Sequence, residues 1–344
     1  MKASKVREPV DKVGFAHLPR QMDAFVRRIE EGEAGIIKAV LLQGLDLPAD
    51  RVWRVAIAPH DDYTYASFMY PLVLSNVRAR TVLVIGVAHK AHTFGLQNRI
   101  VFDSFSHWRG PYGNIAVSPL REALIAELDP GHYVVHDEMQ GVEHSVEAKL
   151  PFLQHYNRDV EIVPILVPAM PHPRMGDIAL ELARAIAKSM GQQWQWGRDL
   201  AIVISTDAVH YGDEGWGGRN FALYGADERG YWRAMAHDRS IMKECFEGEP
   251  VPAKSLLFSR HTVRADDYRE YKWTWCGRYS VPFGMLTAWH LQQTLGVPPL
   301  EGKVLAYATS IDTPHIPVDD LEGMGVTAPA TVRHWVGYAS VGYL

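Results

Sequence analysis

The 344-residue sequence predicts an α/β fold in which helices cover both faces of a mostly parallel central sheet. Four runs of strand length are almost entirely apolar, which is typical of parallel strands buried on both faces: Val55–Ala58, Thr81–Val87, Glu161–Val167 and Leu200–Ser205. Segments with helical spacing lie between these runs, and a histidine closely follows three of them. We therefore expect one domain over residues 1–344, with residues 1–50 forming an N-terminal extension that packs on it.

Composition argues against several classes of protein. The formal net charge is −5, from 35 basic and 40 acidic residues, and no run is rich in lysine or arginine, so we do not expect nucleic acid as a partner. Only two cysteines occur, and the N-terminus lacks the apolar core of a signal peptide, which together predict a reduced, cytoplasmic protein. No apolar run approaches the roughly 20 residues that span a bilayer, so no membrane association is expected.

The remaining elements are predicted from the spacing of apolar residues and from the positions of glycine and proline. In the N-terminal half, helical spacing recurs in three segments: 22–29, 66–77 and 119–128. Residues 100–105 alternate weakly like a strand, and a Gly-Pro pair in residues 108–113 predicts a turn. In the C-terminal half, Pro164 interrupts a strand and favours an edge position or a bulge. The later sequence predicts helices at 178–190, in the second half of 219–247 and at 282–295, and strands at 304–310 and 336–344.

Residues 55–67, V-A-I-A-P-H-D-D-Y-T-Y-A-S, are the strongest candidate for a functional site. A proline ends the apolar run, and His60 follows with two carboxylates and two phenols, where open α/β sheets bind their ligands. We expect Asp62 and Tyr63 to contact a substrate. The alternative is an ordinary strand-to-helix turn in which Asp61 or Asp62 caps the next helix.

Two further strands end beside histidines. His89 follows the strand at 81–87, and Asp207 and His210 follow the strand at 200–205. Because the carboxyl ends of parallel strands meet at one edge of a sheet, the three histidines are expected to converge. We interpret His210 and Asp207 as a catalytic base and its orienting carboxylate, or as hydrogen-bond partners of metal ligands.

The two cysteines have different surroundings. Cys245 lies in a predicted helix and is interpreted as a buried core residue. Cys276 precedes a glycine, between aromatic residues and Arg278, as expected for a ligand or reactive thiol on a loop, with a core thiol as the alternative. Arg278 is expected to hold the thiolate or an anionic substrate. With His60 and His89, Cys276 completes two imidazoles and one anionic group, a set that binds a divalent transition metal and leaves positions open.

His144 is a further candidate for acid–base chemistry. If residues 143–153 are helical, His144 and Glu147 are three positions apart and share one face, which places two proton-carrying groups side by side. The alternative is a solvated helix face.

Six segments, in this order and spacing, resemble the Memo family, which is similar in fold to the LigB-type class III extradiol dioxygenases: A-P-H-D-D-Y-T-Y, V-I-G-V-A-H, E-H-S-V-E-A-K-L-P-F-L, V-P-I-L-V, S-T-D-A-V-H-Y-G and C-G-R. The resemblance covers about residues 54–344 and implies a LigB/Memo-like fold. It also implies a metal bound by His60, His89 and Cys276, and it matches Asp207 and His210 to the family's S-S-D-x-x-H-W motif. His144 matches a histidine that lines the same cleft.

Some positions depart from the family pattern. Asp61 and Asp62 stand where the family usually has Ala-Gly, Lys90 replaces a second histidine, and Tyr211 replaces a tryptophan. The third ligand is a thiolate, which is softer than the carboxylate of the dioxygenases.

The sequence and the resemblance together predict a metal-dependent oxidoreductase or dioxygenase-like enzyme. Iron(II) is the expected metal, with copper or zinc as alternatives, and the expected substrate is a small molecule, such as a catechol. His210, Asp207 and His144 are the predicted catalytic residues. A non-catalytic adaptor that binds metal or peptide is one alternative function, and a zinc hydrolase is another. The resemblance also implies a radical-SAM protein as a partner.

Overall fold

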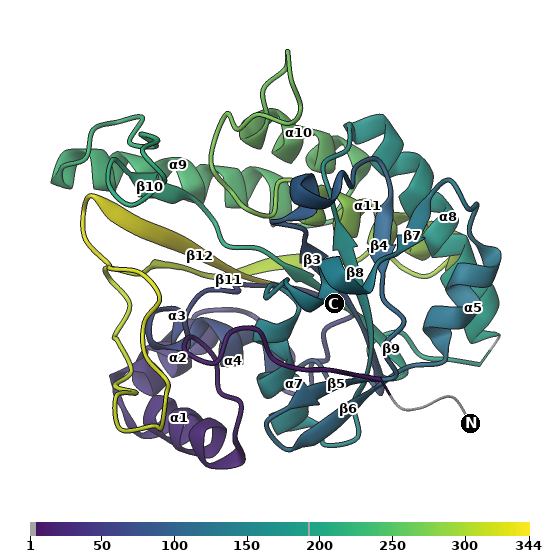
Figure 1. Ribbon diagram of the computed structural model, residues 1–344, viewed down its shortest axis with the longest axis horizontal. Coiled ribbons are helices and arrows are strands. Elements are labelled where there is room, and N and C mark those ends of the chain that lie inside the picture. The colour runs from purple at the N-terminus through teal and green to yellow at the C-terminus, as the bar shows by residue number, and fades with distance from the viewer. Residues whose placement is uncertain (1–4, 192) are drawn as a thin grey trace.

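The computed structural model describes residues 5–191 and 193–344, and the strands of this part of the chain form a twelve-stranded sheet (Figure 1). The strands are β1 (Val6–Arg7), β2 (Val55–Ala58), β3 (Thr81–Val87), β4 (Ile100–Phe102), β5 (His107–Gly110), β6 (Gly113–Val117), β7 (Tyr133–Val135), β8 (Glu161–Val167), β9 (Leu200–Ser205), β10 (His210–Gly212), β11 (Gly302–Thr309) and β12 (His334–Tyr343). Their order is β1-β5-β6-β8-β3-β9-β2-β12-β10, with β11 paired to β12, and with β4 paired to β7 and β8.

The four apolar runs form the parallel centre of this sheet. Strands β2, β3, β8 and β9 begin and end where the sequence predicts, and β9 pairs in parallel with both β2 and β3. Alternate residues enter two separate cores, with Val82 and Val84 on one face and Leu83 and Ile85 on the other. The predicted α/β fold with a mostly parallel sheet is therefore confirmed. Its geometry brings the carboxyl ends of β2, β3 and β9 to one edge.

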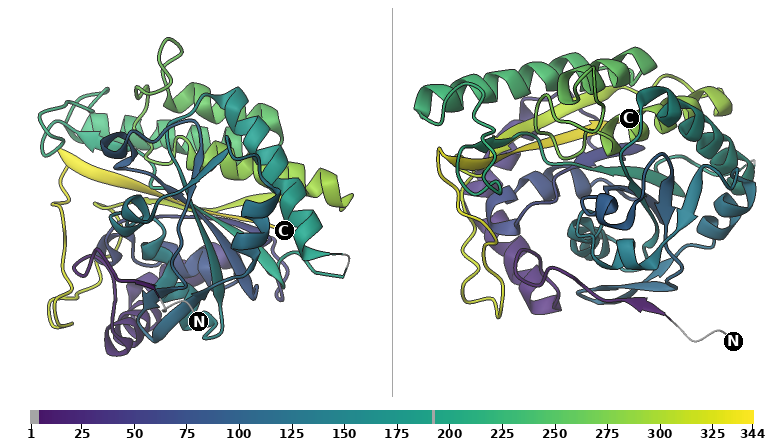
Figure 2. Two further views of the ribbon diagram at one scale, coloured as in Figure 1. Left: turned by 45° about the vertical axis from the view of Figure 1, so that its right-hand side comes forward. Right: turned by 45° about the horizontal axis from the view of Figure 1, so that its top comes forward.

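Helices cover both faces of the sheet, as Figures 1 and 2 show. One core is built with α1 (Pro19–Glu31), α3 (Tyr63–Ala66), α4 (Met69–Leu74) and α7 (Leu150–Tyr156). The other is built with α5 (Leu120–Glu127), α8 (His172–Met190), α9 (Glu228–Phe246), α10 (Pro252–Thr262) and α11 (Ser280–Leu295). The remaining helical segments are α2 (Glu33–Gln43), which packs on α1, α6 (Asp137–Gly141), and the short 3-10 turns η1 (Ala91–Phe94) and η2 (Glu147–Lys149). None of the described helices has the length and apolar character needed to cross a membrane.

Two of the predicted helices differ from the observed ones. The helix expected at 66–77 is split between α3 and α4, because Ser67 has a φ of 42°, a left-handed conformation that a helix cannot continue through. The helix expected at 143–153 begins only at Glu147, as η2 followed by α7. His144 therefore lies on a turn rather than on a helix face.

The edge position expected for Pro164 was wrong, and the turn expected at 108–113 is shorter than predicted. Pro164 lies in an interior strand, since β8 pairs with β3 on one side and with β6 and β4 on the other. On the second side, β6 pairs with β8 only as far as Ile162, and β4 pairs with it at Leu166. Pro164 lies between these two positions, where that side of β8 has no paired residue in the described part of the chain and its missing N–H is not needed. The turn expected at 108–113 is present but shorter, at residues 111–112, where it joins β5 and β6 into a hairpin.

Candidate metal centre

His60 stands at the end of β2 and is fixed by the neighbouring strand. Its backbone N–H donates to Asp207 Oδ1 at 2.8 Å, and its ring Nδ1 lies 2.8 Å from Ser205 Oγ. The single proton of Ser205 is donated to the carbonyl of Ser145 at 2.7 Å, and the same oxygen accepts from the buried ammonium of Lys149. Ser205 must therefore accept from His60 Nδ1–H, which leaves the lone pair on Nε2 facing the site.

His89 follows β3 and is held by one carboxylate. Glu143 accepts the His89 backbone N–H at 2.8 Å and contacts ring Nδ1 at 2.9 Å. Burial alone raises the pKa of Glu143, but the charge of His89 and the hydrogen bond between them outweigh it, so the pKa lies well below its usual range. A carboxylate that accepts from Nδ1–H leaves Nε2 of His89 as the metal-binding nitrogen.

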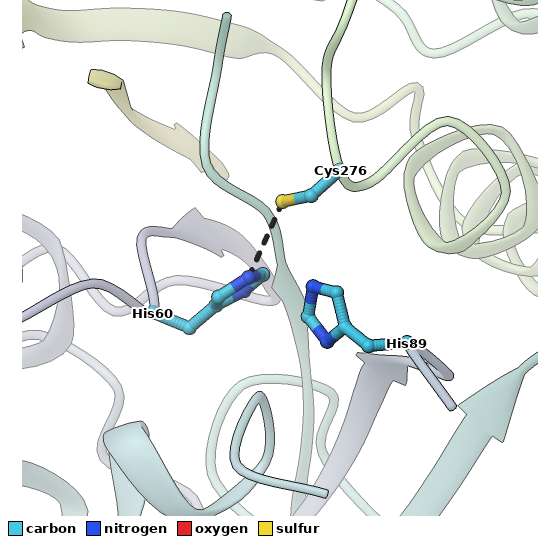
Figure 3. Close-up of side chains that lie close together, drawn as sticks. All are labelled: His60, His89 and Cys276. Atoms are coloured by element: carbon cyan, nitrogen blue, oxygen red, sulfur yellow. Dashed lines mark hydrogen bonds between the residues drawn. The ribbon is translucent and has the colours of Figure 1, made fainter. Parts of the chain in front are cut away.

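Cys276 reaches the same point from the loop before α11. The indoles of Trp273 and Trp275 both donate to the buried carboxylate of Asp238 at 2.6 Å, which anchors the loop to α9. Gly277 is required next to the cysteine, since a Cβ there would lie 2.2 Å from Thr206 Oγ1. The sulfur lies 3.2 Å from His60 Nε2 (Figure 3).

The three side chains point toward one another, as Figure 3 shows, and their donor atoms all lie within 4.8 Å of one another. Burial lowers the pKa of His60 well below its usual value, and burial followed by the charge of Asp207 raises the pKa of the Cys276 thiol. The metal-free protein thus has a neutral imidazole beside a protonated thiol. Protein acceptors hold Nδ1 of both rings, so both Nε2 atoms face the cluster. Burial lowers the pKa of His89, but the charge of Glu143 and their hydrogen bond outweigh it, so a bound ion would displace a proton from His89 Nε2. Two imidazole nitrogens and a sulfur fit a transition-metal ion. The predicted set His60, His89 and Cys276 is brought together.

Two cavities meet at this cluster. The larger, of about 570 Å³, has His89 and Cys276 in its wall, and the smaller, of about 220 Å³, has His60 and His89. His89 lines both. A bound ion would therefore be accessible from two sides.

The predicted catalytic residues line the smaller cavity. His144 stacks on His89 with ring centroids 4.9 Å apart, and burial lowers its pKa to about 4. His210 Nε2 is buried and lacks a hydrogen-bond partner among the described residues. It lies 3.9 Å from Asp207 Oδ2, which is longer than a hydrogen bond. Asp207 is committed instead to the backbone N–H of His60, so the structure does not contain the expected orienting bond to His210.

The predicted substrate-binding residues fall in different places. Asp62 is 2% exposed and accepts from the backbone N–H of Thr327, and Tyr63 is fully buried and donates to the carbonyl of Ala148. Neither lines a cavity at the metal centre, and Asp62 makes no side-chain cap on α3. Asp61 lines the smaller cavity in their place. Arg278 lines the larger cavity, beside Cys276.

The pairing expected between His144 and Glu147 is absent. Glu147 forms a buried ion pair with Arg7 and accepts the backbone N–H groups of Val10 and Asp11. The physical reason is that residues 142–146 turn, so the three-residue spacing does not place the two side chains on one face.

Comparison with known proteins identifies the family of this chain. The family model described as Memo-like protein matches residues 28–319, which is most of the chain. The chain belongs to the Memo family. A MEMO1 family protein of Thermococcus kodakarensis is 27% identical over 271 residues, covering 76% of this chain and 82% of that protein.

Other relatives match over a shorter segment. A MEMO1 family protein of Pyrobaculum aerophilum is 30% identical over 162 residues, covering 45% of this chain and only 52% of its own length. An uncharacterized protein from Escherichia coli K12 of known crystal structure aligns over 82% of this chain and 98% of its own, with 14% identity and a TM-score of 0.42.

In this Memo-family chain, sequence reasoning missed the residues that hold the ligands. Ser205, Lys149 and Glu143 were not singled out, although each offers a sequence signal. Ser205 is the polar end of an otherwise apolar strand, and Glu143 and Lys149 both belong to the segment E-H-S-V-E-A-K-L-P-F-L. Lys149 is fully buried, and burial lowers its pKa to about 7. Together these residues orient the two imidazoles: Ser205, fixed by Lys149, contacts His60, and Glu143 contacts His89.

Proposed function

We propose that this Memo-family protein is an iron(II)-dependent oxidoreductase that acts on a small catechol-like molecule with dioxygen as the oxidant. The observation that supports it is the convergence of two imidazole nitrogens and one sulfur within 4.8 Å at the junction of two cavities. Two histidines and one anionic ligand leave coordination positions for a substrate and an oxidant. Iron bound there would supply those positions and its redox chemistry.

The chain's own residues would bind and move protons in the smaller cavity. His210 Nε2 has no partner among the described residues and is free to accept a proton from a bound hydroxyl group. His144, whose pKa of about 4 keeps its ring neutral at pH 7, offers a second acceptor beside His89. Asp61 closes the wall, and burial together with the charges of Asp207 and Asp62 raises its pKa, so that it favours the protonated form.

The test begins with metal content. Wild type, Cys276→Ala and Cys245→Ala are purified without oxygen and analysed for bound metal; Cys245 is the matched control because it is a buried cysteine on α9, away from the cluster. We expect wild type and Cys245→Ala to hold iron and Cys276→Ala to lose it. Full retention in Cys276→Ala would contradict the proposed centre.

Oxygen uptake then tests the chemistry. The iron-loaded protein is mixed with catechol under air, and consumption of dioxygen that depends on both metal and His210 supports the proposal. Zinc on isolation with ester hydrolysis and no oxygen uptake would assign a hydrolase instead. Metal binding without any turnover would assign a binding protein of the adaptor type.

A further inference from the structure

The larger cavity has a charged wall opposite its metal donors. His89 and Cys276 lie in its wall, and so do three arginines: Arg219, Arg269 and Arg278. One acidic residue, Glu270, lines it as well. A cavity of about 570 Å³ is large enough for a small organic ligand.

Arg278 is held in place by aromatic rings and has no ion-pair partner in residues 5–191 and 193–344. Its guanidinium lies 3.5 Å from the ring centre of Tyr271 and 4.9 Å from that of Tyr279, so the planar group is stacked against aromatic rings. Nη1 is buried and has no hydrogen-bond partner within the described part of the chain. A buried guanidinium nitrogen without an acceptor is costly, and an oxyanion entering the cavity would satisfy it.

The other two arginines differ in whether a carboxylate already pairs with the guanidinium. Arg269 is engaged with Asp267 through two hydrogen bonds, both of 2.9 Å. Arg219 is exposed, and no ion pair is found for it among the described residues. It follows three glycines with positive φ, Gly215, Gly217 and Gly218, and it lies in the wall of the larger cavity. The sequence G-W-G-G thus places a second available positive charge at the cavity.

We propose that Arg278 and Arg219 form an anion subsite that binds the carboxylate or phosphate of the substrate while another group of the same molecule reaches the metal centre. The inference rests on the proposed function for the role of the metal, and it narrows the substrate class to small molecules that carry an oxyanion. The stacked, unpaired Arg278 fixes the anion, because a guanidinium binds an oxyanion with two parallel hydrogen bonds.

The test compares benzoate with benzamide, which has nearly the same shape and no charge, by ligand-detected NMR titration. The full-length protein is used as purified and after removal of metal by a chelator, so that carboxylate binding to an ion is separated from binding to arginine. We expect benzoate to bind roughly tenfold or more tightly than benzamide in both forms. Phenyl phosphate is titrated in parallel. Tighter binding of phenyl phosphate than of benzoate would identify a phosphate subsite, and the reverse order a carboxylate subsite.

Variants then locate the subsite. Arg278→Met removes the preference for benzoate, Arg278→Lys retains part of it, and Arg269→Met is the matched control, since that guanidinium already has Asp267. If Arg278→Met does not fold, Arg219→Met at its exposed position carries the test and lowers the preference. Equal binding of benzoate and benzamide, or equal effects of the Arg278 and Arg269 variants, overturns the subsite. Metal content of the same samples shows separately whether the proposed metal centre stands.

Discussion

Replacing Arg7 by methionine tests how the N-terminal strand supports the metal centre. Arg7 and Glu147 are 2% and 5% exposed and form an ion pair across 140 residues of sequence. Arg7 also donates to the backbone carbonyl of Glu143, the residue that holds His89. Arg7→Met leaves the Glu147 carboxylate buried without its cation.

The expected loss is about 3 kcal/mol in the free energy of unfolding. Removal of one partner from a buried pair costs about 3–5 kcal/mol, and the lower end applies because Glu147 keeps the backbone N–H groups of Val10, at 2.9 Å, and Asp11, at 3.0 Å. Urea unfolding followed by circular dichroism measures it. Arg109→Met is the control, since Arg109 pairs with Glu8 at 3.2 Å on the surface and should cost about 0–1 kcal/mol.

The loss should also depend on pH. Burial raises the pKa of Glu147 above its ordinary 4.5 even with Arg7 present, and removing Arg7 raises it further. Such a group favours the folded state less as pH rises, so the difference between wild type and Arg7→Met is largest at neutral pH and shrinks toward pH 4.5. Adding Glu147→Gln to the variant recovers part of the stability. A cost below 1 kcal/mol at pH 7, equal to that of Arg109→Met, would refute this reasoning.

Three further predictions concern metal binding and the residues that position the proposed ligands. Glu143→Gln keeps the shape but loses the charge that orients His89, so metal affinity, measured by competition with a chelating dye, falls about 10- to 100-fold. Gly277→Ala forces a Cβ to 2.2 Å from Thr206 Oγ1. We expect the amount of bound metal to fall and the free energy of unfolding to decrease by about 1–3 kcal/mol. Metal loading near pH 7 releases at least one proton per ion, because burial and Asp207 keep the Cys276 thiol protonated beforehand, and the raised pKa of His89 adds an imidazolium proton to the release; calorimetry in buffers of different ionisation enthalpy detects it.

These predictions have matched controls. Gly176→Ala adds a Cβ that meets nothing within 4 Å inside α8, so metal binding should not change. Glu122→Gln removes a charge from an exposed residue on α5 and should leave metal affinity intact. Proton release that is undiminished in Cys276→Ala would contradict a contribution from the thiol, since only the proton of His89 should then remain.

The ligand residues could be predicted from the sequence because local pattern and sheet geometry decide them. A run such as Leu200–Ser205, apolar up to its last residue, is typical of a buried parallel strand, and the carboxyl ends of such strands meet at one edge of the sheet. The position of His60 and His89 follows from that rule. That Cys276 would join them was predicted from the metal-binding chemistry of these residue types and from the family resemblance.

The supporting contacts could not be predicted, because they join segments far apart in the chain. The carboxylate that Trp273 and Trp275 share belongs to Asp238 on α9, and no periodicity relates these positions. The pairing expected for Glu147 failed for the same reason: its partner is Arg7, near the start of the chain, and local helical spacing carries no information about that contact. Likewise, no local signal shows that Asp62 faces Thr327 rather than a ligand.

The distance along the chain between His60 and Cys276, 216 residues, has a consequence for how the protein is made. A nascent chain that has emerged from the ribosome as far as β3 contains both imidazoles but no sulfur, and it still lacks β9, which lies between β2 and β3 in the sheet. Stable loading with an ion has to wait until the Cys276 loop has docked on Asp238, so metallation would report that synthesis and folding of nearly the whole polypeptide are complete.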